Sequence, residues 1–326
     1  MPTLLLDRNA VRALLDMPDV IQGVEQAFKD WADGKGKMPS KAYLILNHGD
    51  FRAMPAALPG AVGVKWVNVH PQNPSRGLPT IMAIIIYNNP ETGYPLAIMD
   101  ATDITAYRTG ASAVIASKYL ARSDSHTLGI IGAGHQAYTQ ILAHRQLFDI
   151  KLVKIFDLSR AAVEKLISYF PQYHLKECSL EETAASDIVC TLTPAREPYL
   201  KRKWIVAGTH INAVGADAEG KEELEPSILK EAIVVVDDIK QASAAGEINV
   251  PAAKGLFTIR EVYGTLGEII AGKRHGRGDD NQITVFDSTG VAIEDIAVAR
   301  LVYEKAHQEG GYLSVDLVQA SEPLRN

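Results

Sequence analysis

The sequence predicts an α/β protein in which a Rossmann-type, doubly wound parallel sheet is joined to an α+β module. Two patterns carry this prediction. After residue 124, short apolar runs alternate with helical stretches, which is typical of a parallel sheet covered by helices. Before residue 100, short β-rich runs are separated by Gly, Pro and Asn clusters, and the turn composition of residues 88–93 indicates antiparallel neighbours.

Hydrophobic periodicity gives the elements of the first module. Apolar residues recur at helical spacing over 19–34, where glycines end the segment, so an amphipathic helix opens the module. Four β-rich runs follow and predict strands at 43–46, 61–69, 80–87 and 94–99.

In the second module, apolar runs predict parallel strands at 128–132, 153–156, 188–191, 211–214, 233–236 and 283–286. Helical stretches, among them 136–148 and 161–169, separate most of these strands. A final long helix at 292–307 has no strand after it. It could leave this sheet and pack back on the first module, which would make that module discontinuous.

Length and composition limit the class of protein. The chain has 326 residues, 47% hydrophobic and 22% charged, which fits two globular domains. A formal charge of −6 does not favour a nucleic-acid partner. Two cysteines, Cys178 and Cys190, are too few for a disulfide framework or a metal cage. No apolar run approaches the roughly 20 residues of a membrane span, and the amino terminus does not read as a signal peptide. We therefore expect a cytoplasmic protein without a metal site or a membrane partner.

A glycine-rich turn between a predicted strand and helix points to a dinucleotide. Residues 132–137 read GAGHQA and fit G-x-G-x-x-A, where glycines let the backbone approach a pyrophosphate at a helix amino terminus. Asp157 closes the next strand, where an acid can accept hydrogen bonds from the adenosine ribose, and this favours NAD. Arg160 could instead clamp a 2′-phosphate, so NADP is the less favoured alternative. The predicted cofactor contacts in the turn are Gly132, Ala133, Gly134, His135 and Gln136.

Two cations stand in otherwise apolar patterns. Strand alternation over 61–69 places Lys65 on an apolar face, where lost hydration would lower its pKa toward neutrality. An edge-strand lysine whose ammonium reaches water is the alternative. Helical spacing places Arg108 on a small or apolar stripe, so its guanidinium requires an anion. The candidates are the cofactor pyrophosphate, a substrate carboxylate, or a buried acid such as Asp100 or Asp103.

Residues at the carboxyl ends of predicted parallel strands are further candidates, because ligands of doubly wound sheets collect there. Asp217 would face a nicotinamide and its substrate, unless it only caps a turn. Ser288 and Thr289 could bind a carboxamide or cap the next helix. Arg52, by composition, is a loop residue beside a strand. The other predicted cofactor contacts are Thr193, Val214 and Gly215.

Short segments spread over nearly the whole chain resemble the ornithine cyclodeaminase/μ-crystallin family, and most closely its NAD-dependent archaeal-type alanine dehydrogenases. The segments are FRAMP (51–55), GVKWV (63–67), GLPT (77–80), MDAT (99–102), RTGA (108–111), GAG (132–134), GAD (215–217) with GK (220–221), GE (246–247) and FDSTG (286–290). The resemblance implies a homodimer. It further implies a substrate-binding and dimerisation domain formed by residues 1–120 with 302–326, and an NAD-binding Rossmann domain formed by 121–301.

The resemblance also orders the charged residues by role. It implies that Arg52, Lys65 and Arg108 hold a substrate carboxylate, and that Lys65 and Asp217 are the catalytic groups. Arg108 would also contact the cofactor, and Thr80 would lie near the nicotinamide.

The implied reaction is the oxidation of a small L-amino acid, in first place L-alanine with NAD and water to pyruvate, ammonia and NADH. Ornithine cyclodeamination with bound NAD and the reduction of cyclic imines use the same chemistry and remain alternatives. A cyclodeaminase needs an acceptor for the second ammonium of ornithine, for which Glu247 and Asp287 are weak candidates. A binding protein like μ-crystallin is the alternative outside the enzymes.

Overall fold

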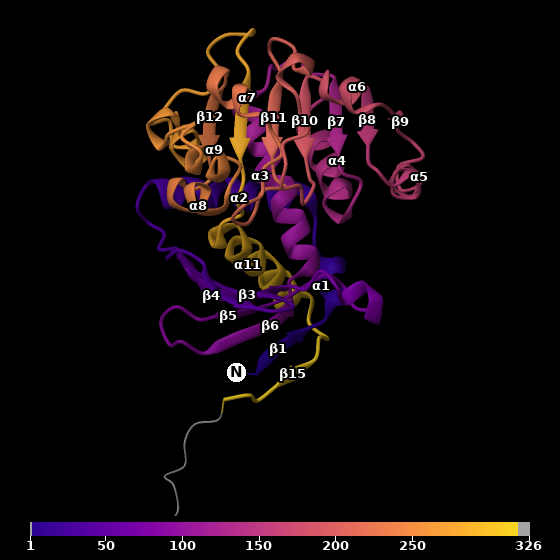
Figure 1. Ribbon diagram of the computed structural model, residues 1–326. Helices are drawn as coiled ribbons and strands as arrows, with labels where there is room; N and C mark the ends of the chain where they lie inside the picture. Colours follow the sequence, from indigo (N-terminus) through magenta and orange to yellow (C-terminus); the bar gives the residue numbers. More distant parts are fainter. Residues whose placement is uncertain (1, 319–326) are drawn as a thin grey trace, which may run out of the picture.

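Two β-sheets form the frame of the protein, one above the other in Figure 1. The computed structural model describes residues 2–318. The first sheet has the order β15-β1-β6-β5-β4-β3-β2, and only β1 and β6 pair in parallel. Its strands are β1 (Thr3–Leu6), β2 (Ala42–Leu46), β3 (Gly49–Leu58), β4 (Ala61–Val69), β5 (Ile81–Asn88), β6 (Pro95–Asp100) and β15 (Ser314–Val315).

The second sheet is parallel throughout and has the order β13-β12-β14-β11-β10-β7-β8-β9. Its strands are β7 (Thr127–Ile131), β8 (Leu152–Phe156), β9 (Leu175–Glu177), β10 (Ile188–Thr191), β11 (His210–Ala213), β12 (Ile233–Val236), β13 (Gly264–Thr265) and β14 (Thr284–Asp287). The chain continues from β7 to β8 on one side and later returns to β10 on the other. This reversal makes the edge between β7 and β10 the expected ligand-binding position and confirms the predicted Rossmann-type fold.

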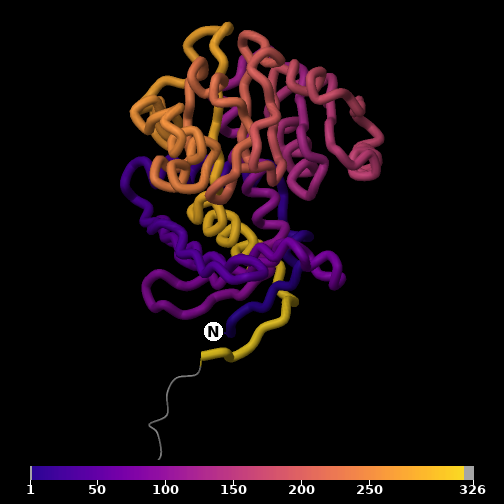
Figure 2. Tube along the Cα trace, in the orientation of Figure 1, coloured from indigo at the N-terminus to yellow at the C-terminus, as the bar shows by residue number. Residues whose placement is uncertain are grey.

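Helices connect and cover the sheets (Figures 1 and 2). The helices are α1 (Arg8–Leu14), α2 (Met17–Ala32), α3 (Thr102–Leu120), α4 (His135–Leu147), α5 (Arg160–Ser168), α6 (Leu180–Ala184), α7 (Pro226–Glu231), α8 (Ile239–Ala245), α9 (Asn249–Ala253), α10 (Leu266–Ile270) and α11 (Ala292–Glu309). None of the helices within 2–318 is long and apolar enough to span a membrane.

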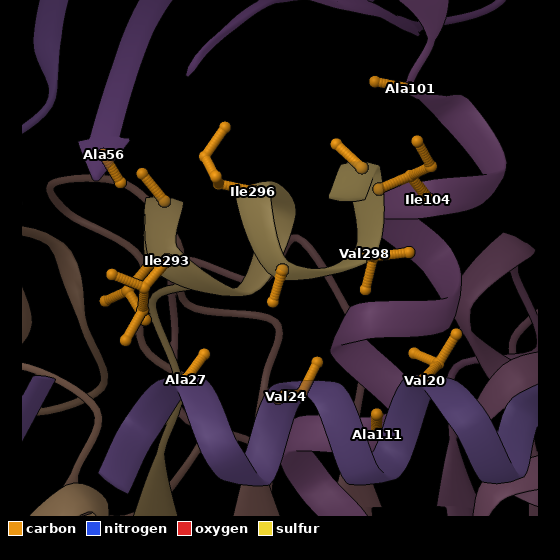
Figure 3. Packing of buried hydrophobic residues seen from close by; sticks show 14 of the residues in the cluster. Val20, Val24, Ala27, Ala56, Ala101, Ile104, Ala111, Ile293, Ile296 and Val298 are labelled. Atoms are coloured by element: carbon orange, nitrogen blue, oxygen red, sulfur yellow. The ribbon is translucent and has the colours of Figure 1, made fainter. Parts of the chain in front are cut away.

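Helix α11 leaves the second sheet and packs against β3, β4 and α2 of the first module. Figure 3 shows Ile293 and Ile296 of α11 above Val24 and Ala27 of α2, all within one buried apolar cluster. The strand arrows of the second sheet in Figure 1 point toward α11 and the first sheet. Helix α11 and the first sheet therefore lie at the carboxyl edge of the second sheet. The expected boundary between residues 301 and 302 falls inside α11. We propose instead that all of α11 belongs with the first module.

The sequence-based elements were incomplete at one important place. The sequence predicts no strand at 49–58 and a loop at Arg52. In the structure, β3 spans residues 49–58 and pairs with both β2 and β4. The segment GDFRAMPAAL is rich in small residues and contains Pro55, which disfavours a central strand on local grounds. Pairing with two neighbouring strands overrides that local preference. Arg52 is therefore fixed on a sheet.

Candidate active site

A cavity of about 240 Å³ lies between the carboxyl edge of the second sheet and the inner face of the first sheet. Five cationic side chains line it, namely Lys41, Arg52, Lys65, Arg108 and Lys221, and the one acidic lining residue within the described chain is Asp217. Apolar side chains complete the wall: Met54, Val67, Val69, Ile81, Leu192, Pro194 and Val214. The cavity therefore has the positive charge to bind an anion, and an apolar wall lies beside that charge.

Strand alternation in β4 points Lys65 inward, as the sequence predicted, and its side chain is 1% exposed. Its Nζ donates to Asp295 Oδ1 at 2.7 Å and to Thr105 Oγ1 at 3.4 Å. Burial lowers the pKa of Lys65 and so does the nearby Arg108, while Asp295 raises it, and the result is about 8. An amine with this pKa can exchange protons near neutral pH.

Arg108 lies on α3 and is held from the side opposite the cavity. Its Nη1 donates to Glu294 Oε2 at 2.7 Å, and its Nε donates to Asp295 Oδ1 at 3.1 Å. Arg108 therefore both lines the cavity and forms a buried ion pair. Its acidic partners are Glu294 and Asp295, not Asp100 or Asp103 as the sequence suggested. Asp103 instead accepts from Arg8 and Arg12 on α1.

Arg52 and Asp217 meet across the cavity from different modules. Arg52 Nη1 donates to Asp217 Oδ2 at 3.1 Å, and Arg52 Nε donates to Asp50 Oδ1 at 2.7 Å. Asp217 also pairs with Lys221, and its side chain is 33% exposed. Burial raises the pKa of Asp217, but Lys221 and Arg52 lower it by a larger amount, so the pKa is about 2. This carboxylate stays ionised throughout the neutral range.

The glycine turn has the geometry that a dinucleotide needs. Gly132 has a φ of +102°, and a side chain there would come within 3.2 Å of the Leu192 carbonyl group. Gly134 has no neighbouring atom within 4 Å of where a Cβ would lie, so space is open in front of the amino terminus of α4. Asp157 accepts a hydrogen bond from the Ala133 N–H at 2.7 Å, which places its carboxylate beside the turn.

The loops that follow β10, β11 and β14 are each held by a buried acid. Glu223 accepts hydrogen bonds from the Thr193 N–H at 2.8 Å and from the Gly215 N–H at 2.9 Å. Asp237 accepts from the N–H groups of Thr289 at 2.6 Å and Gly290 at 2.7 Å. Burial raises the pKa of Asp237, and the value is about 6. These anchors fix one wall of the cavity.

Comparison with known proteins agrees with this architecture. The sequence pattern of the ornithine cyclodeaminase/mu-crystallin family matches residues 1–310. The chain belongs to this family. An alanine dehydrogenase of Archaeoglobus fulgidus is 51% identical over 308 residues, covering 94% of this chain and 96% of that protein. A Delta(1)-pyrroline-2-carboxylate reductase of Bacillus cereus is 34% identical over 319 residues, covering 94% and 98%. The structure of an archaeal alanine dehydrogenase dimer with bound NAD superposes with a TM-score of 0.96 at 49% identity, covering 98% of this chain and 100% of that one.

In this member of the ornithine cyclodeaminase/mu-crystallin family, the structure brings most of the predicted residues to one cavity. Arg52, Lys65, Arg108 and Asp217 line it together with Gln136, Thr193, Val214, Gly215, Ser288 and Thr289. Gly132, Ala133, Gly134, His135 and Asp157 lie at the glycine turn, outside this lining. A second cavity of about 620 Å³ adjoins Ala133, Gly134 and His135 on the side of α1 and α5.

Several predicted residues do not reach the cavity. Thr80 immediately precedes β5 and accepts from the His70 N–H at 2.8 Å, and its neighbour Ile81 lines the wall instead. Arg160 points to Glu164 at 3.0 Å and lies on the surface. The two candidate acceptors for a second ammonium, Glu247 and Asp287, are fully buried among backbone N–H groups and are not lining residues.

The sequence analysis gave no site role to four charged residues found here, namely Lys41, Lys221, Glu294 and Asp295. Lys41 donates to the Thr289 carbonyl at 2.6 Å, from a loop without periodicity that carries no sequence signal. Glu294 and Asp295 hold the two inward cations. These acids interrupt an otherwise apolar stretch from 291 to 299, and that interruption could have identified them.

Proposed function

We propose that this protein is an NAD-dependent dehydrogenase that oxidises L-alanine to pyruvate and ammonia. The observation that carries the proposal is the cavity of about 240 Å³, in which five cations and one carboxylate of the described chain lie beside an apolar wall. Such a lining suits an α-amino carboxylate with a short apolar side chain. The 51% identity to an alanine dehydrogenase supports the same substrate.

NAD fits the residues at the carboxyl edge of the second sheet. The open space before Gly134 would receive a pyrophosphate at the α4 amino terminus, and Asp157 would accept hydrogen bonds from the ribose. We favour NAD over NADP, because Arg160 is engaged by Glu164 and Glu177 and would have to leave both to clamp a 2′-phosphate. The bound nicotinamide would supply the acceptor for the substrate hydride.

The chain's own side chains would orient the substrate and move its proton. Arg52 and Arg108 hold the carboxylate, which fixes the position of the substrate Cα. In its neutral amine form, which dominates above its pKa of about 8, Lys65 accepts a proton from the substrate ammonium. Asp217 stays ionised and stabilises the positive charge of the iminium product. Water then adds to the iminium carbon, and ammonia leaves with pyruvate.

The same lining disfavours ornithine. A second ammonium would enter a cavity that already holds five cations. Within residues 2–318, the acid lining it is Asp217, which is paired with both Arg52 and Lys221. Reduction of a cyclic imine carboxylate is the second candidate, because such a substrate lacks the extra charge and the chain is 34% identical to a pyrroline-carboxylate reductase. A purely binding role is less favoured, because the cavity contains both a lysine able to exchange protons and two arginines able to bind a carboxylate.

We further propose a homodimer that uses the outer face of the first sheet. Trp66 of β4 and Ile84 of β5 are direct neighbours on this face and are 40% and 44% exposed. The edge strand β2 is exposed along its length, with Ile45 80% exposed. A second copy would remove this apolar surface from water. A cytoplasmic location remains our expectation, in keeping with two cysteines that are both free thiols.

The test is NADH absorbance with purified protein, NAD and, separately, L-alanine, L-ornithine and L-proline. We expect net NADH with alanine, and NADH consumption with pyruvate and ammonia. Proline formation from ornithine without net NADH would instead show a cyclodeaminase. Turnover only with L-proline and NAD, or only with pyrroline-2-carboxylate and NADH, would show a cyclic imine reductase. NAD binding without turnover of any of these substrates would show a binding protein.

A further inference from the structure

Two buried acids of α11 lie behind the cavity and face its two inward cations. Asp295 Oδ1 accepts from Lys65 Nζ at 2.7 Å and from Arg108 Nε at 3.1 Å, so a single oxygen joins the two cations. Glu294 Oε2 accepts from Arg108 Nη1 at 2.7 Å. The side chains of both acids are fully buried, and neither lines the cavity.

These acids serve the two cations and nothing else in the described chain. Within residues 2–318, Asp295 Oδ2 and Glu294 Oε1 have no hydrogen-bond donor. Burial raises the pKa of Glu294, although Arg108 lowers it, and the value is about 7, so Glu294 is mostly ionised at the pH where Lys65 titrates. A buried carboxylate with half of its acceptor capacity unused is costly unless a neighbouring cation needs its charge. Their position in the first turn of α11 favours negative charge, because the helix dipole is positive there.

Lys65 experiences charges from each element packed around it. Arg108 from α3 and Lys41 from the loop before β2 disfavour its ammonium form, and Asp295 from α11 favours it. Glu294 faces Arg108, and Asp237 faces Lys41. Asp295 is the acid in direct contact with Lys65, so it is the main local support for the ammonium.

We propose that Asp295 is a positioning residue that supplies the counter-charge of Lys65 and locks it to Arg108 through one shared oxygen, while Glu294 fixes the outer end of the Arg108 guanidinium. The inference rests on the proposed function and extends it, since it explains how the proton-accepting lysine and a carboxylate-binding arginine are held in place for the substrate. It predicts that the charge of Asp295 sets the pH at which Lys65 loses its proton. It also predicts that the geometry of Glu294 sets carboxylate affinity.

The experiment measures the proton affinity of Lys65 without relying on turnover. Wild-type protein with bound NADH is pulsed with acetic anhydride over a series of pH values, and acetylation of Lys65 is quantified by peptide mass spectrometry. The affinity for pyruvate is measured over the same pH range from NADH fluorescence. The variants are Asp295→Asn, Asp295→Glu and Glu294→Gln. Asp187→Asn is the control, because Asp187 accepts from Arg122 and Thr127 at the opposite edge of the second sheet.

We expect the Lys65 midpoint of Asp295→Asn to fall by about one pH unit or more, since the supporting charge is lost while Arg108 and Lys41 remain. Asp295→Glu keeps the charge on a longer arm, so its midpoint should stay near that of the wild type while pyruvate affinity falls. Glu294→Gln should weaken pyruvate binding without moving the midpoint. Asp187→Asn should change neither quantity.

A folded Asp295→Asn variant with the wild-type Lys65 midpoint would overturn the proposal. If Asp295→Asn does not fold, the pyruvate affinity of Asp295→Glu tests the proposal instead. Wild-type affinity in Asp295→Glu would show that the position of the Asp295 carboxylate does not matter, and it would overturn the proposal. The acetylation midpoint stands independently of the substrate. Failure of alanine oxidation by the wild type would therefore reject the proposed function and leave this result interpretable.

Discussion

Replacing Gly290 by alanine should damage the substrate site through Arg108. Gly290 has a φ of +73° and packs against the guanidinium, so that an added Cβ would come within 2.5 Å of Arg108 Nη1. An ordinary contact begins near 3.4 Å, and the guanidinium must therefore retreat by about 0.9 Å. That retreat changes the geometry of its 2.7 Å hydrogen bond to Glu294. The left-handed backbone adds about 1–2 kcal/mol of strain.

A misplacement of about 1 Å in a substrate-orienting group can reduce the rate about 100-fold. We therefore expect kcat/KM of Gly290→Ala for alanine to fall between roughly 10-fold and 100-fold. The matched control is Gly272→Ala, because Gly272 has a φ of +70° and no atom lies within 4 Å of where its Cβ would be. It should show the same backbone strain in thermal unfolding and unchanged kinetics. Equal kcat/KM in wild type and Gly290→Ala would refute the reasoning.

Three further predictions follow from other parts of the structure. Trp66→Asp should sediment as a monomer at concentrations where the wild type is a dimer, whereas Ile259→Asp, at a position 51% exposed on the second module, should not change the mass. Glu223→Gln leaves some of the five hydrogen bonds to Glu223 unmade, so the urea midpoint of unfolding should drop by the equivalent of about 2–4 kcal/mol. An unchanged midpoint would contradict the anchoring role of Glu223. Lys65 loses its charge as the pH rises through its pKa of about 8, so pyruvate affinity of the NADH complex should fall above that pH. The fall should be absent in Lys65→Arg, because arginine keeps its proton.

The parallel sheet and the glycine turn could be predicted from the sequence because both depend on local patterns. Apolar runs of strand length mark β7, β10 and β11, and only glycine readily adopts the conformation of Gly132. The inward direction of Lys65 followed from the two-residue period of a strand. These features require no knowledge of distant neighbours.

The partners of the charged residues were decided by the tertiary structure alone. Arg108 and the acids that hold it are 186 and 187 residues apart in sequence, and their contact arises because α11 returns from the second module to cover the first sheet. The position of Arg52 depended on strand pairing that its own segment does not favour. Periodicity therefore identified which side chains point inward, while the identity of the groups they meet required the packing of the two modules.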